Sequence, residues 1–216
     1  MRKTRTASVE SRKMIDKLQN GQTSAVFSLN DLVKAAKANA DGEGAPPVEN
    51  WNPDFCGEMD LVIRADGSWW HEGTRISRDT LVMLYSTILR KDADGRHYLV
   101  TPVEKIGIQV EKAAFLAARV DIEGSGKGQS LFFTTNVGEV VEAGPDRPIR
   151  VVTDPETGEP SPFVLVRGRL EAFMRRPVFY ELVEAATEID TPEGKQLGVY
   201  SGGMFFPLGP AGSHLI

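Results

Sequence analysis

Turn-forming residues interrupt the chain so often after Trp51 that only short secondary-structure elements fit between them. Asp66-Gly67 and Asp94-Gly95 are strong hairpin signals, and further glycines and prolines follow at similar intervals. Parallel neighbours in a sheet need crossover connections of a dozen or more residues, whereas a short turn is enough to join antiparallel strands. We therefore expect an α+β protein with mostly antiparallel sheets, and with helix and strand in comparable amounts.

Alternating apolar and polar residues predict the strands between these turns. At 114–122 the alternation outweighs the helix that the alanines suggest, so this segment is predicted as a strand. Apolar residues at helical spacing predict helices over 28–38, 78–89 and 177–187, the last with proline in its first turn. The predicted strands cover 59–64, 97–102, 104–110, 114–122, 130–136, 137–143, 148–152 and 163–170.

The sequence divides into two small β-rich domains flanked by tails. We expect residues 1–43 to be a polar tail with one short helix, which stops in the stretch ADGEGAPP, a linker or domain entrance that ends near Pro47. The expected units are an N-terminal α+β domain over 44–103, a C-terminal β-rich domain over 104–190 and an irregular tail over 191–216.

A faint internal repeat connects the two expected domains. The repeat consists of MDLVIR…TRISRDTLVMLYSTIL and FVLVRGRLEAFMRRPVFYELVEAA. Both segments predict a strand, a bend, a basic residue and an amphipathic helix, with Arg78 matching Arg175. The sequence therefore predicts a duplicated strand–helix motif.

Composition narrows the class of function. A formal net charge of −5 argues against DNA or RNA as a partner, because phosphate neutralisation needs clustered lysine and arginine. No run approaches the roughly 18 to 20 apolar residues of a membrane span, and the start has no apolar signal segment. The single cysteine, Cys56, excludes an internal disulfide and a cysteine-rich zinc site. We expect a cytoplasmic protein with no membrane partner and no cofactor.

Three motifs that suggest catalysis or metal binding each have a plainer interpretation. The stretch GSGKGQS at 124–130 lacks P-loop spacing and lies between predicted strands, so it is predicted as a turn. His71-Glu72 has no second histidine at helical spacing, which favours a strand histidine over a metal ligand. Cys56 has no sequence cue for reactivity, and the chain contains no Gly-x-Ser-x-Gly nucleophile motif.

The best physical indication of a ligand is the arginines at the start of two predicted helices. Arg78 and Arg175 lie where the positive end of a helix disfavours a cation. Arginine and the backbone N–H groups there suit a phosphate or carboxylate, while a structural salt bridge of Arg78 with Glu104 or Asp79 is the alternative. Further candidates are the aromatic residues Trp69, Trp70 and Tyr98, for stacking, and the cations Arg75 and Lys105.

Several sequence blocks resemble a bacterial family known as domain of unknown function 1285. They are PPVENWNP, MDLVIRADGSWWHEGTRISRDTLVML, FFTTNVGEVVEA and FVLVRGRLEAFMRRPVFYEL. The resemblance covers roughly residues 44 to 190. It implies two small domains with a duplicated motif, a C-terminal half similar to a pleckstrin-homology-like β roll, and a nucleotide-like ligand in the interdomain cleft with a part in signal transduction. It implies no catalytic residue. The positions that it implies for ligand binding are His71, Arg75, Arg78, Thr101, Glu104, Lys105, Asn136, Arg167 and Arg175.

Three hypotheses for function follow. The first is binding of a small anionic, nucleotide-like ligand between the domains, with aromatic residues stacking its ring and cations holding its phosphate. The second is an enzyme acting on a phosphorylated metabolite, with Glu104 and His71 as acid and base. The third is a protein-interaction module that uses the pleckstrin-homology-like half and the tails.

Overall fold

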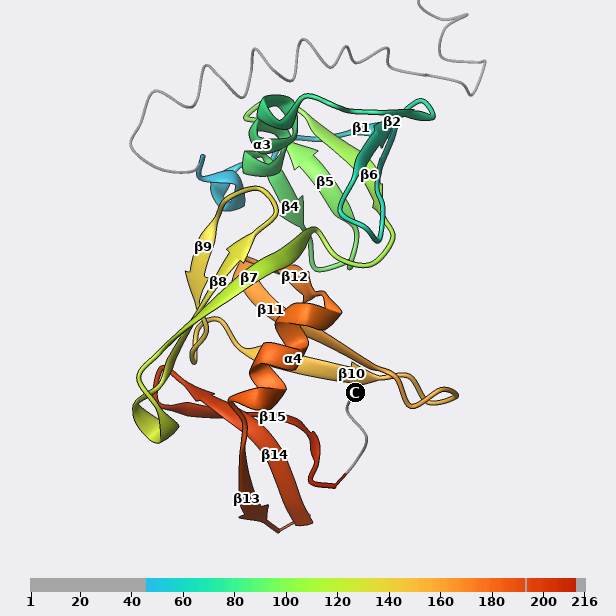
Figure 1. The fold of residues 1–216 in the computed structure, drawn as a ribbon. Helices are drawn as coiled ribbons and strands as arrows, with labels where there is room; N and C mark the ends of the chain where they lie inside the picture. The colour runs from blue at the N-terminus through green and yellow to red at the C-terminus, as the bar shows by residue number, and fades with distance from the viewer. Residues whose placement is uncertain (1–45, 193, 213–216) are drawn as a thin grey trace, which may run out of the picture.

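The computed structural model describes residues 46–192 and 194–212, which form three sheets and two α-helices (Figure 1). The helix predicted over 28–38 lies outside the described residues. The first domain contains η1 (Val48–Asn50), β1 (Phe55–Ile63), β2 (Trp69–His71), β3 (Thr74–Arg75), α3 (Asp79–Thr87), β4 (Leu89–Lys91), β5 (His97–Val100) and β6 (Lys105–Val110). The second contains β7 (Phe115–Glu123), η2 (Gly126–Gly128), β8 (Ser130–Thr135), β9 (Val140–Glu142), β10 (Ile149–Thr153), β11 (Pro160–Arg167), β12 (Leu170–Met174), α4 (Arg176–Glu184), β13 (Thr187–Thr191), β14 (Gly194–Ser201) and β15 (Met204–Pro210).

The two large sheets share one topology. The first has the order β3-β2-β1-β6-β5-β4 and the second the order β10-β11-β12-β7-β8-β9. Each consists of two three-stranded antiparallel meanders, joined where the first strand of one meander pairs in parallel with the last strand of the other. All other pairings between the named strands are antiparallel, which confirms the prediction of mostly antiparallel sheets.

The helices do not follow this duplication. In the first domain α3 connects the two meanders, whereas α4 follows the last strand of the second sheet. The repeat expected from the sequence therefore aligned β1, the first strand of the first sheet along the chain, with β11, the fifth strand of the second sheet. The misalignment arises because a short strand–helix unit is a common local pattern that does not specify its place in a sheet. Within residues 46–192 and 194–212 strand content also far exceeds helix content, so the expected balance of helix and strand is wrong for the described residues.

The domain boundary lies after β6 rather than at 103/104. β6 pairs with β1 and β5 and so completes the first sheet. The segment that follows it is tied back to the first domain, because the backbone N–H of Ala65 donates to the Glu111 carboxylate over 2.8 Å. The second sheet begins only with β7.

Within the segment expected as an irregular tail over 191–216, residues 194–210 instead form the hairpin β14–β15, which pairs with β13 in a third sheet (Figure 1). The hydroxyl of Ser201, which is fully buried, fastens this sheet to the second one. Its oxygen accepts the N–H of Leu131 over 2.9 Å, and its O–H donates to the carbonyl of Ala143 over 2.6 Å. The side-chain amide of Gln129 donates to the carbonyl of Tyr200 over 3.1 Å.

Each large sheet packs its apolar face against a helix. In the first domain, the indole of Trp69 stacks on the Tyr85 ring of α3 at a centroid distance of 6.3 Å. In the second, α4 buries Val178, Phe179 and Leu182 and contacts β7 and β14. α4 therefore lies between the second and third sheets, with its first turn beside the end of β12 (Figure 1).

Candidate functional site

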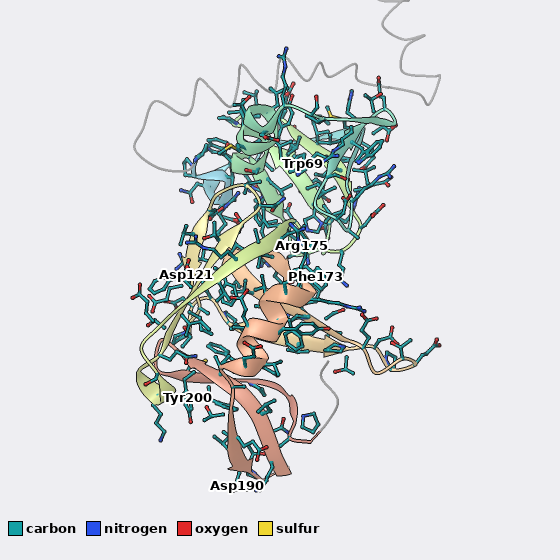
Figure 2. All side chains as sticks on the ribbon, in the orientation of Figure 1. Trp69, Asp121, Phe173, Arg175, Asp190 and Tyr200 are labelled. Carbon is teal, nitrogen blue, oxygen red and sulfur yellow. The ribbon has the colours of Figure 1, made fainter. Side chains whose placement is uncertain are left out.

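A cavity of about 600 Å³ lies in the second domain at the start of α4, and we refer to it as the α4 cavity. It is bounded by the first turns of α4, the end of β12, the loop between β10 and β11, and Lys112 of the segment between the two sheets. Figure 2 shows Phe173 and Arg175 together at the point where β12 leads into α4. This volume is in the range of small-molecule sites.

The alternation of β12 explains why the aromatic side chain of Phe173 faces this cavity. Leu170, Ala172 and Met174 point into the core, so Phe173 points to the opposite face of the sheet. The chain then stays extended at Arg175, the N-cap of α4, and no side chain caps the first helical turn. Arg176 opens the helix and Pro177 follows it, in the position where proline is best tolerated.

Positive charge dominates the α4 cavity. Lys112, Arg175 and Arg176 line it together with one carboxylate, Glu159. The Arg176 guanidinium lies 2.8 Å from the Glu159 carboxylate, and this hydrogen bond raises the pKa of Arg176. The Arg175 side chain has no hydrogen bond or ion pair with any residue in the described part of the chain. The partial positive charge of the α4 N-terminus adds to this field.

Aromatic rings form the other part of the lining. The ammonium of Lys112 lies 3.7 Å from the ring centroid of Phe173, which itself packs on Phe163 at 5.6 Å. Tyr180, one turn into α4, keeps 39% of its surface exposed at the cavity. Cations beside exposed ring surface suit a ligand that carries both a planar group and an anion.

Among the nine residues expected to bind a ligand, Arg175 is the one that lines the α4 cavity. Thr101 and Lys105 have structural contacts in the first domain. The buried Thr101 hydroxyl accepts the N–H of Glu104 over 3.1 Å and so shapes the turn before β6. The Lys105 ammonium is 2.5 Å from the Asp92 carboxylate and 4.1 Å from the ring centroid of Tyr98.

Asn136 and Arg167 connect the two domains. The Asn136 side chain accepts the N–H of Leu116 over 2.9 Å and donates to the carbonyl of Gly67 in the first domain over 3.5 Å. The Arg167 guanidinium donates to the carbonyl of Ser86, at the end of α3, over 2.5 Å and to that of Leu89, at the start of β4, over 3.2 Å. It also pairs with Glu139 at 3.2 Å. These two side chains are occupied in holding the interface.

His71, Arg75 and Arg78 lie on the first domain, outside the α4 cavity. Arg78 is the N-cap of α3, as Arg175 is of α4, and its side chain is exposed. His71 lies on β2 and Arg75 on the edge strand β3. The structure therefore does not bring Arg78 and Arg175 together at one cavity.

The acid–base pair expected for an enzyme is also separated. His71 pairs with Leu61 of β1, whereas Glu104 precedes Lys105, which pairs with Phe55 at the other end of that strand. Six residues of extended strand place the two ends roughly 20 Å apart. His71 and Glu104 therefore do not form one catalytic pair.

A second, shallower cavity of about 390 Å³ lies between the domains. Its lining includes Arg169 of the second domain and the carboxylates Glu49, Asp92 and Asp94 of the first. Arg90 in its wall is buried and already donates to Asp92 and to the carbonyls of Val48 and Trp51. Three carboxylates make this cavity a poor match for an anion.

Sequence reasoning missed Lys112 in the α4 cavity and Arg90 in the first domain. Lys112 follows a strand in a charged stretch and has no pattern that distinguishes it from a surface lysine. Arg90 did carry a signal, because it interrupts the apolar run before β5.

Within residues 46–192 and 194–212 no helix is long and apolar enough to cross a membrane, and no cluster of three metal-binding side chains occurs.

Comparisons with known proteins identify relatives. Residues 46–113 match the model for the N-terminal domain of DUF1285, a domain of unknown function, and residues 114–208 match the model for its C-terminal domain. A crystal structure of a DUF1285 family protein from Silicibacter pomeroyi DSS-3 is 44% identical, with a TM-score of 0.75, over 83% of this chain and 95% of that one. Another crystal structure of a DUF1285 family protein, from Shewanella baltica OS155, is 25% identical, with a TM-score of 0.46, over 59% of this chain and 92% of that one. No curated protein matches.

Proposed function

This chain belongs to the DUF1285 family, whose function is unknown, and from that premise we propose that it binds a small anionic ligand with a planar ring in the α4 cavity. One observation carries the proposal. Arg175 is a cation at the positive end of a helix, lines a cavity of about 600 Å³, and has no acidic partner in the described residues. A cation in that position is unfavourable unless an anion compensates it.

The rest of the lining supports the same class of ligand. Lys112 and Arg176 provide two further cations, and Tyr180 provides exposed ring surface. A nucleotide combines these features, because its base stacks on aromatic rings while its phosphate pairs with guanidinium and ammonium groups. Binding without turnover is favoured over an enzyme because His71 and Glu104 lie far apart. The signalling role and the pleckstrin-homology-like roll that the family resemblance implies stay predictions.

Binding of adenosine 5′-monophosphate to Arg175→Ala and Arg78→Ala tests the proposal. Both arginines are exposed helix N-caps, but only Arg175 lines the α4 cavity, so Arg78→Ala is a matched control. We expect Arg175→Ala to weaken binding by about tenfold or more, through loss of a charge-assisted contact, and to leave the fold at least as stable. Isothermal titration calorimetry and thermal melting measure the two effects.

Equal affinity of the two variants, or no binding of this nucleotide by the unmodified protein, would contradict the proposal. A lower melting temperature of Arg175→Ala with unchanged affinity would show that the arginine is structural.

A further inference from the structure

Among the described residues, Glu159 is the one acidic side chain that lines the α4 cavity, and its carboxylate lies beside the Arg176 guanidinium. We propose that the cavity takes a phosphomonoester dianion, and that Glu159 is an internal competitor which occupies Arg176 until the phosphate displaces it. This inference rests on the proposed function and adds to it the charge of the ligand and a residue that tunes its affinity.

The charges of the lining point to a dianion. Three cations and one carboxylate leave two positive charges when Glu159 stays, and three when it moves away. A phosphomonoester carries a charge of about −1.5 to −2 at pH 7 and has three strongly accepting oxygens, so it can engage several cations at once. Once Glu159 has moved away, a phosphodiester or carboxylate, with one charge, would leave about two positive charges uncompensated, whereas a dianion leaves about one.

Glu159 resembles the anion that would replace it. Its carboxylate is 2.8 Å from the Arg176 guanidinium, and both side chains are largely exposed, at 60% and 74%. An exposed ion pair of this kind is weak, because water screens it and two long side chains must be ordered. A dianion that also reaches Arg175 and Lys112 therefore has the stronger interaction and can displace the carboxylate.

The loop that carries Glu159 is ordered by its own hydrogen bonds. The Asp154 carboxylate accepts the N–H groups of Glu156 and Thr157 over 2.8 and 2.9 Å, and the Asp154 N–H donates to the carbonyl of Glu159 over 3.0 Å. Changing the Glu159 side chain removes none of these contacts. Glu159→Gln should therefore leave the loop in place.

The test compares Glu159→Gln with Glu156→Gln in the full chain. Glu156 is exposed in the same loop and does not line the cavity, so its variant makes the same change in net charge without freeing Arg176. The probes are phenyl phosphate and methyl phenyl phosphate at pH 7.5 and 0.15 M salt, which share a ring and differ by one negative charge. Calorimetric titration measures the affinity of each variant, and of the unmodified protein, for both probes.

We expect the unmodified protein to bind phenyl phosphate at least about tenfold more tightly than methyl phenyl phosphate. Glu159→Gln should strengthen phenyl phosphate binding by about two- to fivefold, the range expected for an exposed ion pair. The affinity of Glu156→Gln for phenyl phosphate should stay within about 1.3-fold of that of the unmodified protein, because salt screens a charge that does not touch the site.

Three outcomes would overturn the inference. Weaker or unchanged binding by Glu159→Gln would show that Glu159 contacts the ligand or has no part in binding, while the proposed function would stand. Equal affinity for the two probes would exclude a dianion site. No binding of either probe by any of the three proteins would contradict this inference and the proposed function together.

Discussion

Single residues in the first domain show how charge is accommodated between strands. Arg90 is 5% exposed and donates from its guanidinium to two carbonyls of the entering chain and to Asp92. Lys105 shares that carboxylate. These contacts compensate the buried charge. Burial raises the pKa of Asp92, but the hydrogen bonds and charges of Arg90 and Lys105 together outweigh it and lower that pKa overall. The cation expected at position 105 to bind a ligand is thus part of the scaffold.

His97 makes stability depend on pH. Burial, and then the positive charge of Lys91, lower the pKa of His97 to about 4, although Glu171 acts in the opposite direction. Between about pH 6.5 and 4 the unfolded chain binds a proton that the folded protein does not. Stability should therefore fall as the pH falls through this range, on the order of 1 kcal/mol between pH 7 and 5, since the ring is partly exposed.

Urea unfolding of the unmodified protein and of His97→Gln at pH 7 and pH 5 measures this contribution. The variant should lose less stability on acidification than the unmodified protein. An identical loss in both proteins would show that His97 is not the group responsible.

At the scale of elements, local patterns identified hairpins well and the C-terminal strands poorly. Asp66-Gly67 does close β1–β2, and the alternation over 114–122 does form β7. The end of the chain looked irregular because of its glycines and prolines. In the structure Gly202 and Gly203 form the turn of β14–β15 in the left-handed region, and Pro207 and Pro210 lie on an edge strand, where proline is tolerated.

Ser201 provides a test of how this C-terminal hairpin is attached. Ser201→Ala leaves the N–H of Leu131 and the carbonyl of Ala143 without their buried partner. The free energy of unfolding should fall by about 2 to 4 kcal/mol. Ser125→Ala, at an exposed serine whose side chain caps nothing, is the control and should have little effect in urea unfolding. Equal stability of the two variants would mean that the third sheet does not depend on Ser201.

For the whole molecule, the duplicated sheet topology and the domain interface could not be derived from the sequence. Asn136 and Arg167 were expected to bind a ligand, but each meets groups of the first domain that are far away in sequence. The α4 cavity likewise combines Lys112, Glu159 and Arg175, which come from three separate segments. Helix-start arginines predicted an anion site, and only the fold distinguishes Arg175, which lines the α4 cavity, from Arg78, which does not.

A two-dimensional amide NMR titration with adenosine 5′-monophosphate tests most directly whether the ligand binds in the α4 cavity. We expect the largest chemical-shift changes at Lys112, residues 157–160 and residues 173–180, which surround the α4 cavity. Shift changes concentrated at residues 71–78 of the first domain, or at Glu49 and residues 92–94 of the interdomain cavity, would contradict this expectation.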